Sequence, residues 1–349
     1  MKAAVWHGTK DVRIENVEEP VVNPGQVKVK VEWTGICGSD LHAYHHGIGV
    51  QTGVPHPISG EMAPLTLGHE FAGTVAEVGD GVTNVSVGDR VTIEPLIYCE
   101  ECEYCRQGRY NQCERFGFVG LNANGGFAEY AIVQPYMVHK LPDHVSLEEG
   151  ALVEPTAVAF HAVRSSRMKV GDKVAVFGVG PIGLLTILSA KAAGASQIIA
   201  VDVSDERLAK AQEIGATAMI NGARQNTEEE ILALTGTGVD VAFEAAGAQP
   251  TFTNAVNTVK KGGEVVVIAA FAKPASIDLM QLMVKEASVT AILAYRHIFP
   301  EIISLIANGT LDVKQVVTKK IALDNLIEEG FELLIQDKSQ AKILTKIQP

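Results

Sequence analysis

The sequence predicts an α/β protein with two domains, a barrel-like all-β domain followed by a doubly wound parallel sheet. Two observations carry this prediction. From Met1 to about Pro142, short strands are punctuated by glycine and proline, whereas from Lys173 onward buried strands alternate with helical patterns. The chain has 349 residues, of which 47% are hydrophobic, and this is enough material for two buried cores.

The first domain is expected to consist of short strands and to end in a helix. Its strands are VKVKVEW, FAGTVAEVG, GDRVTIEP and GGFAEYAIV, and the helix is SLEEGALVEPTAVAFHAV. Ser146 and Glu149 form a capping-box signature at the start of this helix, so the domain boundary is placed on it. We therefore assign residues 1–152 to the first domain, 153–294 to the second, and 295–349 to a segment that returns to the first.

The second domain is expected to be a parallel sheet because its strands are apolar throughout and are separated by helices. The strands are KVAVF, QIIAV, ATAMI, VDVAFEA and EVVVIAA, and the helices include DERLAKAQEIG and PTFTNAVNTVKKGG. After about Ala294, the stretches FPEIISLIANG and DNLIEEGFELLIQ are predicted helices, and AKILTKI is a closing strand.

Charge and targeting signals exclude several classes of function. There are 29 Lys and Arg against 41 Asp and Glu, a net charge of −12, and no basic stripe that could follow a nucleic acid. The N-terminus lacks the apolar core of a signal peptide, and the longest apolar run, from Val174, is broken by three glycines and a proline. We expect a cytoplasmic protein with no membrane or nucleic-acid partner, whose cysteines bind metal in preference to forming disulfides.

A glycine-rich turn is the first candidate binding site. In VAVFGVGPIGLL the glycines have G-x-G-x-x-G spacing directly after a strand, and Asp202 ends the next strand, where a carboxylate would hold ribose hydroxyls. This pattern predicts a Rossmann domain that binds NAD in preference to NADP, although Arg207 weakens the preference. A glycine turn with a surface aspartate remains the structural alternative. The expected cofactor contacts are Gly178, Gly180, Pro181, Ile182, Gly183, Asp202 and Arg207.

Four of the five cysteines lie within one short segment, residues 95–115. Cys99, Cys102, Cys105 and Cys113 follow the pattern C-x2-C-x2-C-x7-C, and four thiolates can fill the tetrahedral shell of a structural zinc. A filled shell leaves no position for substrate. A redox dithiol pair or an iron–sulfur cluster are the alternatives.

A second metal site is predicted from residues that lie far apart in the sequence. Cys37 follows a strand, His69 and Glu70 precede another, and Glu154 lies near the domain boundary. One thiolate, one imidazole and one or two carboxylates suit a zinc that keeps a position open for water or substrate. Taken singly, each residue could be an ordinary buried or exposed side chain.

In combination these features resemble the zinc-dependent medium-chain dehydrogenase/reductase family. GHEFAGTVAEVGDGV carries the family's zinc signature, with Gly68, His69, Glu70, Gly73, Gly79 and Val82. The resemblance covers the whole chain. It implies a GroES-like β-barrel catalytic domain, a Rossmann domain, one catalytic and one structural zinc, NAD as the cofactor, and a homo-oligomer that is a dimer or tetramer. Because some relatives lack the four-cysteine segment, its zinc is expected to serve folding or assembly.

The resemblance also implies roles for individual residues. Ser39 would accept the alcohol proton and His42 would pass it toward water, while Cys37 and His69 are the expected zinc ligands. Either Glu70 or Glu154 would bind the zinc directly or through a water molecule. Taken without the resemblance, Ser39 is a turn cap and His42 a surface histidine.

The stretches GVPHPISGEMAPLTLGHE, ALVEPTAVAFHAVRSS and AYRHIFPEI resemble the diol-oxidising branch of the family, which lies close to the sorbitol dehydrogenases. They imply interconversion of a vicinal diol and its hydroxyketone, (R,R)-2,3-butanediol and acetoin, with diacetyl reduction as a further activity. Arg296 would hydrogen-bond the second oxygen of the substrate, or be a surface charge. A polyol dehydrogenase is the alternative enzyme, and a noncatalytic NAD-sensing zinc protein the alternative of another class.

Overall fold

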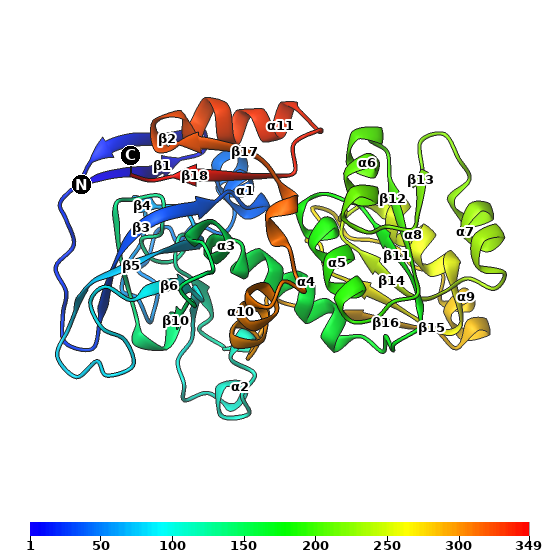
Figure 1. Ribbon diagram of the computed structural model, residues 1–349, viewed down its shortest axis with the longest axis horizontal. Helices are drawn as coiled ribbons and strands as arrows, with labels where there is room; N and C mark the ends of the chain where they lie inside the picture. The colour runs from blue at the N-terminus through cyan, green and yellow to red at the C-terminus, as the bar shows by residue number, and fades with distance from the viewer. Residues whose placement is uncertain (349) are drawn as a thin grey trace. The chain divides into compact units, whose positions relative to one another are not determined.

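The computed structural model describes residues 1–348, and the chain divides into two compact units (Figure 1). Unit 1 contains residues 1–154, 296–309 and those from Val317 on, and unit 2 contains residues 155–295 and 310–316. The chain thus enters unit 2 after Glu154, leaves it after Tyr295 and returns to it for residues 310–316. No helix in the described part combines the length and the apolar character needed to cross a membrane.

Unit 1 is built mainly of antiparallel strands in three sheets. The strands of the small sheets, in spatial order, are β2 (Asp11–Asn16), β1 (Lys2–Gly8) and β4 (Leu65–Thr66), and then β7 (Leu96–Ile97) and β8 (Gly117–Phe118). The large sheet has the order β10 (Val138–Lys140), β6 (Arg90–Ile93), β5 (Glu70–Val78), β3 (Val27–Gly35), β18 (Lys342–Lys346) and β17 (Val317–Ala322), with β9 (Tyr130–Val133) also paired to β3.

The C-terminal strand β18 pairs antiparallel with β3 and is thus part of the first unit's main sheet. Strand β3 is buried at almost every position and supplies Val27, Val29 and Val31 to the core. The helices of this unit are α1 (Gly38–His46), α2 (Glu103–Arg106), α3 (Leu147–Ala151) and α10 (Phe299–Ala307), with short 3₁₀ turns at Tyr110–Gln112, Pro135–Met137 and Leu323–Asn325, and a π-helical turn at Leu326–Glu332 that leads into α11 (Leu333–Gln336).

Unit 2 is a six-stranded, wholly parallel sheet, as the buried apolar strands predicted. Its order is β13 (Ala218–Asn221), β12 (Gln197–Asp202), β11 (Lys173–Phe177), β14 (Val239–Glu244), β15 (Val259–Val267) and β16 (Ser288–Ala291). Its helices are α4 (Val153–Ser165), α5 (Pro181–Ala192), α6 (Asp205–Ile214), α7 (Thr227–Thr235), α8 (Gln249–Thr258) and α9 (Leu279–Lys285), followed by a 3₁₀ turn at Val313–Val316.

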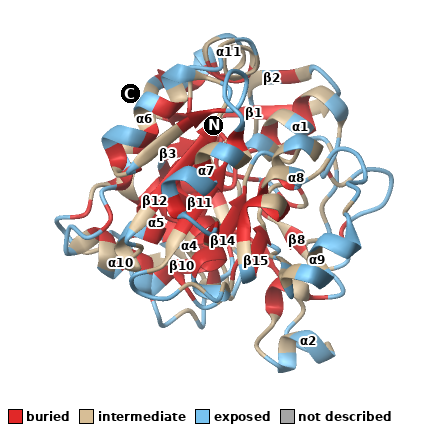
Figure 2. Cartoon of the chain, turned by 90° about the vertical axis from the view of Figure 1, so that its right-hand side faces the viewer, coloured by how far each residue is buried: buried red, intermediate tan, exposed pale blue. Residues whose placement is uncertain are grey.

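The first strand in the sequence, β11, lies in the middle of this sheet, with the chain winding outward on both sides of it. Such an order creates a switch point at the carboxyl ends of the central strands, where dinucleotides bind. Strands β11, β12 and β14 are largely buried (Figure 2). Helices α5 and α6 pack against β11–β13, and helix α8 packs against β14 and β15. The packed helices therefore fix the position of the carboxyl ends of β11, β12 and β14, where a dinucleotide would bind.

Two predicted helices have different bounds in the structure. The capping box of Ser146 and Glu149 is formed, but the predicted long helix is split into α3 and α4. Pro155 has no amide proton to donate to the carbonyl four residues earlier, and this interrupts the helix. The second predicted helix extended through the glycine pair at Gly262, but helix α8 ends at Thr258 and strand β15 begins at Val259. Glycine disfavours the helix interior, which agrees with the earlier end.

Candidate active site and metal centres

Cys37, His69 and Glu70 come together in unit 1, with one ligand atom from each lying within 4.8 Å of the others. The sheet register brings them together. Gly35 at the end of β3 is paired with Glu70 at the start of β5, and Cys37 follows Gly35 by two residues as the N-cap of α1. His69 is 3% exposed and Glu70 is fully buried. Burying polar side chains costs free energy unless they are paired, so this cluster needs partners for its polar atoms.

The two nitrogens of the His69 ring face different partners. Nε2 lies 3.1 Å from the hydroxyl oxygen of Ser39, and Nδ1 lies 3.6 Å from Oδ1 of the fully buried Asp40. The other oxygen of Asp40 accepts a 2.9 Å hydrogen bond from the backbone N–H of Cys37. A carboxylate behind a histidine fixes the tautomer in which Nδ1 carries the proton and Nε2 is free to bind a metal.

Asp40 is a functional residue that sequence reasoning missed. It lies three residues after Cys37, at the position where an acidic side chain closes a capping box, and this was the available signal. Neither Oδ1 of Asp40 nor Nδ1 of His69 has a conventional hydrogen-bond partner among the described residues. The two atoms face each other at 3.6 Å, so a proton on Nδ1 of His69 would point at this carboxylate when Nε2 binds a metal.

The electrostatics of the cluster fit a divalent cation. Burial opposes protonation of His69, but the charges of Asp40, Cys37 and Glu154 outweigh it and hold the pKa of His69 well above its usual value. Glu154, 4% exposed at the start of α4, therefore acts on the same site. Thiolate, imidazole and carboxylate donors gathered around one point are the ligand set of a catalytic zinc.

Glu70 has a further partner that sequence reasoning also missed. The ammonium group of Lys342, on β18, lies 2.7 Å from both carboxylate oxygens of Glu70. A lysine within the apolar strand AKILTKI was the available signal, because lysine is almost never fully buried unless it is paired.

The structure places the remaining predicted catalytic residues on α1 and after β16. Ser39 is half-buried in the first turn of α1, next to His69, and His42 is exposed on the following turn. Arg296 is half-buried, and its guanidinium donates a 3.3 Å hydrogen bond to the side chain of Asn111. Arg296 is thus held by the segment that contains the last cysteines of the four-cysteine group.

The four cysteines of the 95–115 segment form the second metal cluster. Their sulfur atoms lie within 4.8 Å of one another, and all five cysteines of the chain are free thiols. Backbone N–H groups of Cys102 and Cys99 point at the sulfurs of Cys99 and Cys113, each at 3.3 Å. Burial opposes ionisation of Cys99, but the Cys102 N–H and the neighbouring thiols lower its pKa to about 7.

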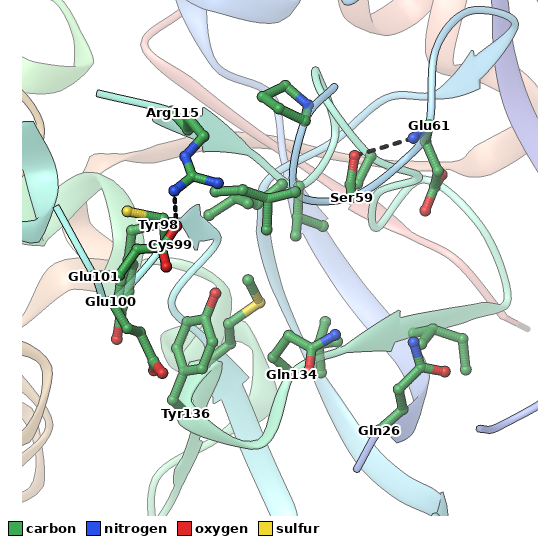
Figure 3. A pocket seen from close by; sticks show the side chains of 18 residues that line it. Gln26, Ser59, Glu61, Tyr98, Cys99, Glu100, Glu101, Arg115, Gln134 and Tyr136 are labelled. Carbon is green, nitrogen blue, oxygen red and sulfur yellow. Dashed lines mark hydrogen bonds and ion pairs between the residues drawn. The ribbon is translucent and has the colours of Figure 1, made fainter. Parts of the chain in front are cut away.

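This geometry fits a structural zinc, since four thiolates close its coordination shell. A pocket of about 630 Å³ lies beside the cluster, lined by Tyr98, Cys99, Glu100 and Tyr136 among others (Figure 3). Arg115, the cation labelled in this view, is paired with Glu101. Cys37, His69 and Glu70 are not among the residues that line this pocket.

The glycine turn of unit 2 has the form expected of a dinucleotide site. Gly178 has φ +85°, and a Cβ there would lie 2.7 Å from the side chain of Ala246. A Cβ on Gly183 would lie 1.9 Å from the carbonyl oxygen of Gly178, so helix α5 can approach the turn only with glycine there. At Gly180, the N-cap of α5, a Cβ would meet only the tip of Arg207, at 4.0 Å.

The open space at Gly180 lies at a helix N-terminus, where backbone N–H groups and the helix dipole favour a phosphate. Pro181 and Ile182 form the first turn of α5. Asp202 ends β12, and one of its oxygens accepts a 2.8 Å hydrogen bond from the backbone N–H of Val179. The carboxylate is therefore fixed beside the turn.

Comparisons with known proteins identify the family to which this chain belongs. Residues 23–143 match the family described as "Alcohol dehydrogenase GroES-like domain", and residues 181–308 match "Zinc-binding dehydrogenase". The chain is 51% identical over 348 residues to an (R,R)-butanediol dehydrogenase of Bacillus subtilis, covering 99% of both chains. It is 36% identical over 344 residues to a sorbitol dehydrogenase of the same organism, covering 97% of this chain and 95% of the relative.

Among solved structures, the fold matches the crystal structure of 2R,3R-butanediol dehydrogenase from Bacillus subtilis with a TM-score of 0.94 and 50% identity, covering 99% of each chain. The GroES-like and Rossmann parts predicted from the sequence are thereby confirmed, as is the resemblance from which they were inferred. On the combined basis of fold, metal-ligand clusters and similarity over its whole length, the chain belongs to the zinc-dependent alcohol dehydrogenase family.

Proposed function

We propose that this protein is an NAD-dependent enzyme that interconverts (R,R)-2,3-butanediol and acetoin, and that it also reduces diacetyl. The observation that carries a catalytic role is the Cys37–His69–Glu70 cluster, which is distinct from the four-cysteine cluster and is not closed by four thiolates. The whole-length similarity to a butanediol dehydrogenase supports the substrate class. A metal site with three protein ligands leaves one coordination position for a substrate, which favours an enzyme over a noncatalytic NAD sensor.

Cys37 and His69, with a carboxylate from Glu70 or Glu154, would hold the catalytic zinc. When bound, zinc supplies a Lewis acid that stabilises negative charge on the substrate oxygen, and NAD supplies the acceptor for the hydride on the neighbouring carbon. The protein's own residues then manage position and protons. Asp40 holds the His69 ring so that Nε2 faces the cluster.

Ser39 is placed to take the proton of the substrate hydroxyl, because its Oγ lies 3.1 Å from His69 at the edge of the cluster. His42, exposed one turn later on α1, would pass this proton to water. In the reverse direction the same two groups deliver a proton to the ketone oxygen. The hydride leaves with the cofactor, so each turnover of the diol releases one proton to solvent.

The test is a steady-state assay of metal-replete protein with pure butanediol stereoisomers, acetoin and sorbitol, each with NAD and NADP. We expect the highest kcat/KM for the (R,R) diol with NAD, since Asp202 would repel a 2′-phosphate. Equal or higher kcat/KM for sorbitol would favour a polyol dehydrogenase, which the 36% identical sorbitol dehydrogenase makes the second candidate. A preference for NADP would contradict the role of Asp202, and no NADH formation with any of these alcohols would contradict the proposal itself.

We propose Arg296 as the residue that recognises the second oxygen of the substrate. Losing one charged hydrogen bond costs about 1.5–3 kcal/mol, so Arg296→Met should lower kcat/KM for the diol about 10–100-fold. With 2-butanol, which has no second hydroxyl, kcat/KM should stay within about threefold of the unmodified enzyme. Equal losses for the two alcohols would show that Arg296 acts only through its hydrogen bond to Asn111.

We propose that the protein is a homo-oligomer joined through the sheet edge at β16. Within the described residues this strand pairs only with β15, and helix α9, which precedes it in the chain, exposes Leu279, Met280, Met283 and Val284. Two copies of an unpaired edge can pair about a two-fold axis, and the same axis would bring two copies of the apolar helix together. The face would then be covered by a second copy of this chain.

Met283→Asp should therefore shift the protein to monomers, measured by analytical ultracentrifugation over a range of concentrations. The control is Val87→Asp, in unit 1, whose side chain is about as exposed as that of Met283, at 63% against 65%. Val87→Asp should leave the mass unchanged. A monomeric natural chain, or a Met283→Asp protein of unchanged mass, would contradict this interface.

A further inference from the structure

Two histidines lie one turn apart on the exposed face of helix α1. His42 and His46 are both exposed, and their ring centroids lie 6.3 Å from each other with an angle of 32° between the ring planes. Residues four apart on a helix lie on the same face, one above the other. The helix therefore presents two imidazole rings side by side to solvent.

Neither ring is hydrogen-bonded within the protein. Among the described residues, no side-chain hydrogen bond or ion pair joins His42 or His46 to another residue. The third histidine of the helix, His45, packs edge-on against the ring of Tyr44, and its Nε2 atom is buried. The two rings that face solvent with free nitrogen atoms are thus those of His42 and His46.

This arrangement suits a divalent transition-metal ion. Imidazole nitrogens are preferred ligands of Zn²⁺, Cu²⁺ and Ni²⁺, and two histidines four residues apart on one helix face chelate zinc in other proteins. Each ring must bring one nitrogen to about 2.0–2.1 Å from the ion. Because both side chains are exposed and unpaired, rotation about their side-chain torsions can achieve this without moving the backbone of α1.

The position of the pair on the helix also favours a cation. His46 is the last residue of α1, and Gly47 ends the helix in the left-handed conformation, at φ +66°. The carboxyl-terminal end of a helix carries partial negative charge, which attracts cations within the last turn. The net charge of the chain, −12, adds to this attraction. Unlike the two clusters described above, this pair contains no cysteine and lies on the surface.

We propose that His42 and His46 form a third metal site, which binds a divalent transition-metal ion from solvent and slows diol oxidation when it is filled. A histidine nitrogen that is bound to a metal cannot accept a proton, so the ion would interrupt the path from Ser39 through His42 to water. The inhibitory part of this inference rests on the proposed function. The binding part depends only on the two rings.

The experiment uses the full chain with zinc in both candidate clusters, and Zn²⁺ alone as the probe. The protein is dialysed to equilibrium against a series of buffered free Zn²⁺ concentrations. Zinc per chain and kcat with (R,R)-2,3-butanediol are then measured on the same samples. We expect one further equivalent of zinc per chain, and kcat should fall toward that of His42→Ala as this equivalent binds.

His46→Gln tests the site without altering the proton path. Loss of one of two linked ligands should weaken binding of the further zinc about 10²-fold, because the second imidazole binds at a high effective concentration. Without added zinc, kcat should stay at the natural level, and inhibition should require correspondingly more zinc. The matched control is His144→Gln, which removes another exposed histidine of unit 1 and should behave like the natural chain in both measurements.

Three results would overturn the proposal. A natural chain that takes up no further zinc before it unfolds or precipitates would exclude the site. A further equivalent that His46→Gln binds with unchanged affinity would assign the ion to other residues. A filled site with unchanged kcat would exclude the inhibitory role. Failure of the proposed function would appear separately, as a natural chain that does not oxidise the diol but still binds a further zinc in a His46-dependent way.

Discussion

Cys37→Ser should lower kcat/KM for diol oxidation about 10³-fold while leaving the fold intact. The thiolate of Cys37 is one of the donors of the candidate catalytic metal, so its loss should weaken binding of that metal. Losing about 4 kcal/mol of charge stabilisation on the substrate oxygen corresponds to a fall of about 10³-fold in kcat/KM. The measurements are kcat/KM with (R,R)-2,3-butanediol and the zinc content of the same preparation.

The matched control makes the same substitution in the other cluster. Cys105→Ser should also release metal, and it should lower the thermal unfolding midpoint, because a structural zinc contributes directly to folding free energy. Activity per folded molecule should stay within about threefold, since four thiolates leave no position for substrate. Equal loss of activity in the two variants would remove the distinction between a catalytic and a structural metal.

Ser39→Ala should leave zinc bound and lower kcat severely. General acid–base groups contribute about 10²–10⁴-fold, and Ser39 is the hydroxyl beside His69, at 3.1 Å. Ser39→Thr keeps a hydroxyl at the same place and should recover most of the rate. His42→Ala should have a smaller effect, because water can replace an exposed group at the end of the proton path.

The pH dependence of kcat distinguishes a proton relay from loss of shape. If Ser39 carries the proton, the alanine variant should lose rate most steeply at neutral pH and recover toward high pH, where hydroxide can take the proton directly. A uniform loss at every pH would instead indicate a misplaced substrate. Turnover at the natural level in Ser39→Ala would exclude Ser39 from the relay.

Much of this architecture can be predicted from the sequence because its signals are local. The apolar runs of β11, β12 and β14 and the glycines at 178, 180 and 183 require a particular backbone at their own positions. The four cysteines are close in sequence, so their cluster needs only one loop and the short helix α2. In such cases, the distance between residues along the sequence is enough to predict that they lie close together in the structure.

The parts that sequence reasoning missed depend on register between distant strands. Lys342 reaches Glu70 only because β18 and β5 both flank β3 and because Gly35 leaves a gap between them. Asp40 was visible as a helix-capping residue, but its second contact, to His69, arises only when β5 is placed beside β3. The break between α3 and α4 was not predicted, because the helical spacing of apolar residues continues across it. Pro155 has no backbone N–H to donate to the preceding turn, and the spacing of apolar residues does not record this.

The residues at which the chain leaves unit 2 have an unusual backbone. Ala294 and His297 both have positive φ values, +47° and +49°, a conformation that costs a residue with a side chain about 1–3 kcal/mol. After this turn, the backbone N–H of His297 donates to the hydroxyl of Tyr110 at 2.6 Å, and its ring lies 2.9 Å from the carbonyl of Gly108. The four-cysteine segment thus holds His297 just after this turn. Loss of the metal from the four cysteines should therefore increase the mobility of residues 294–297 as well as that of the segment itself.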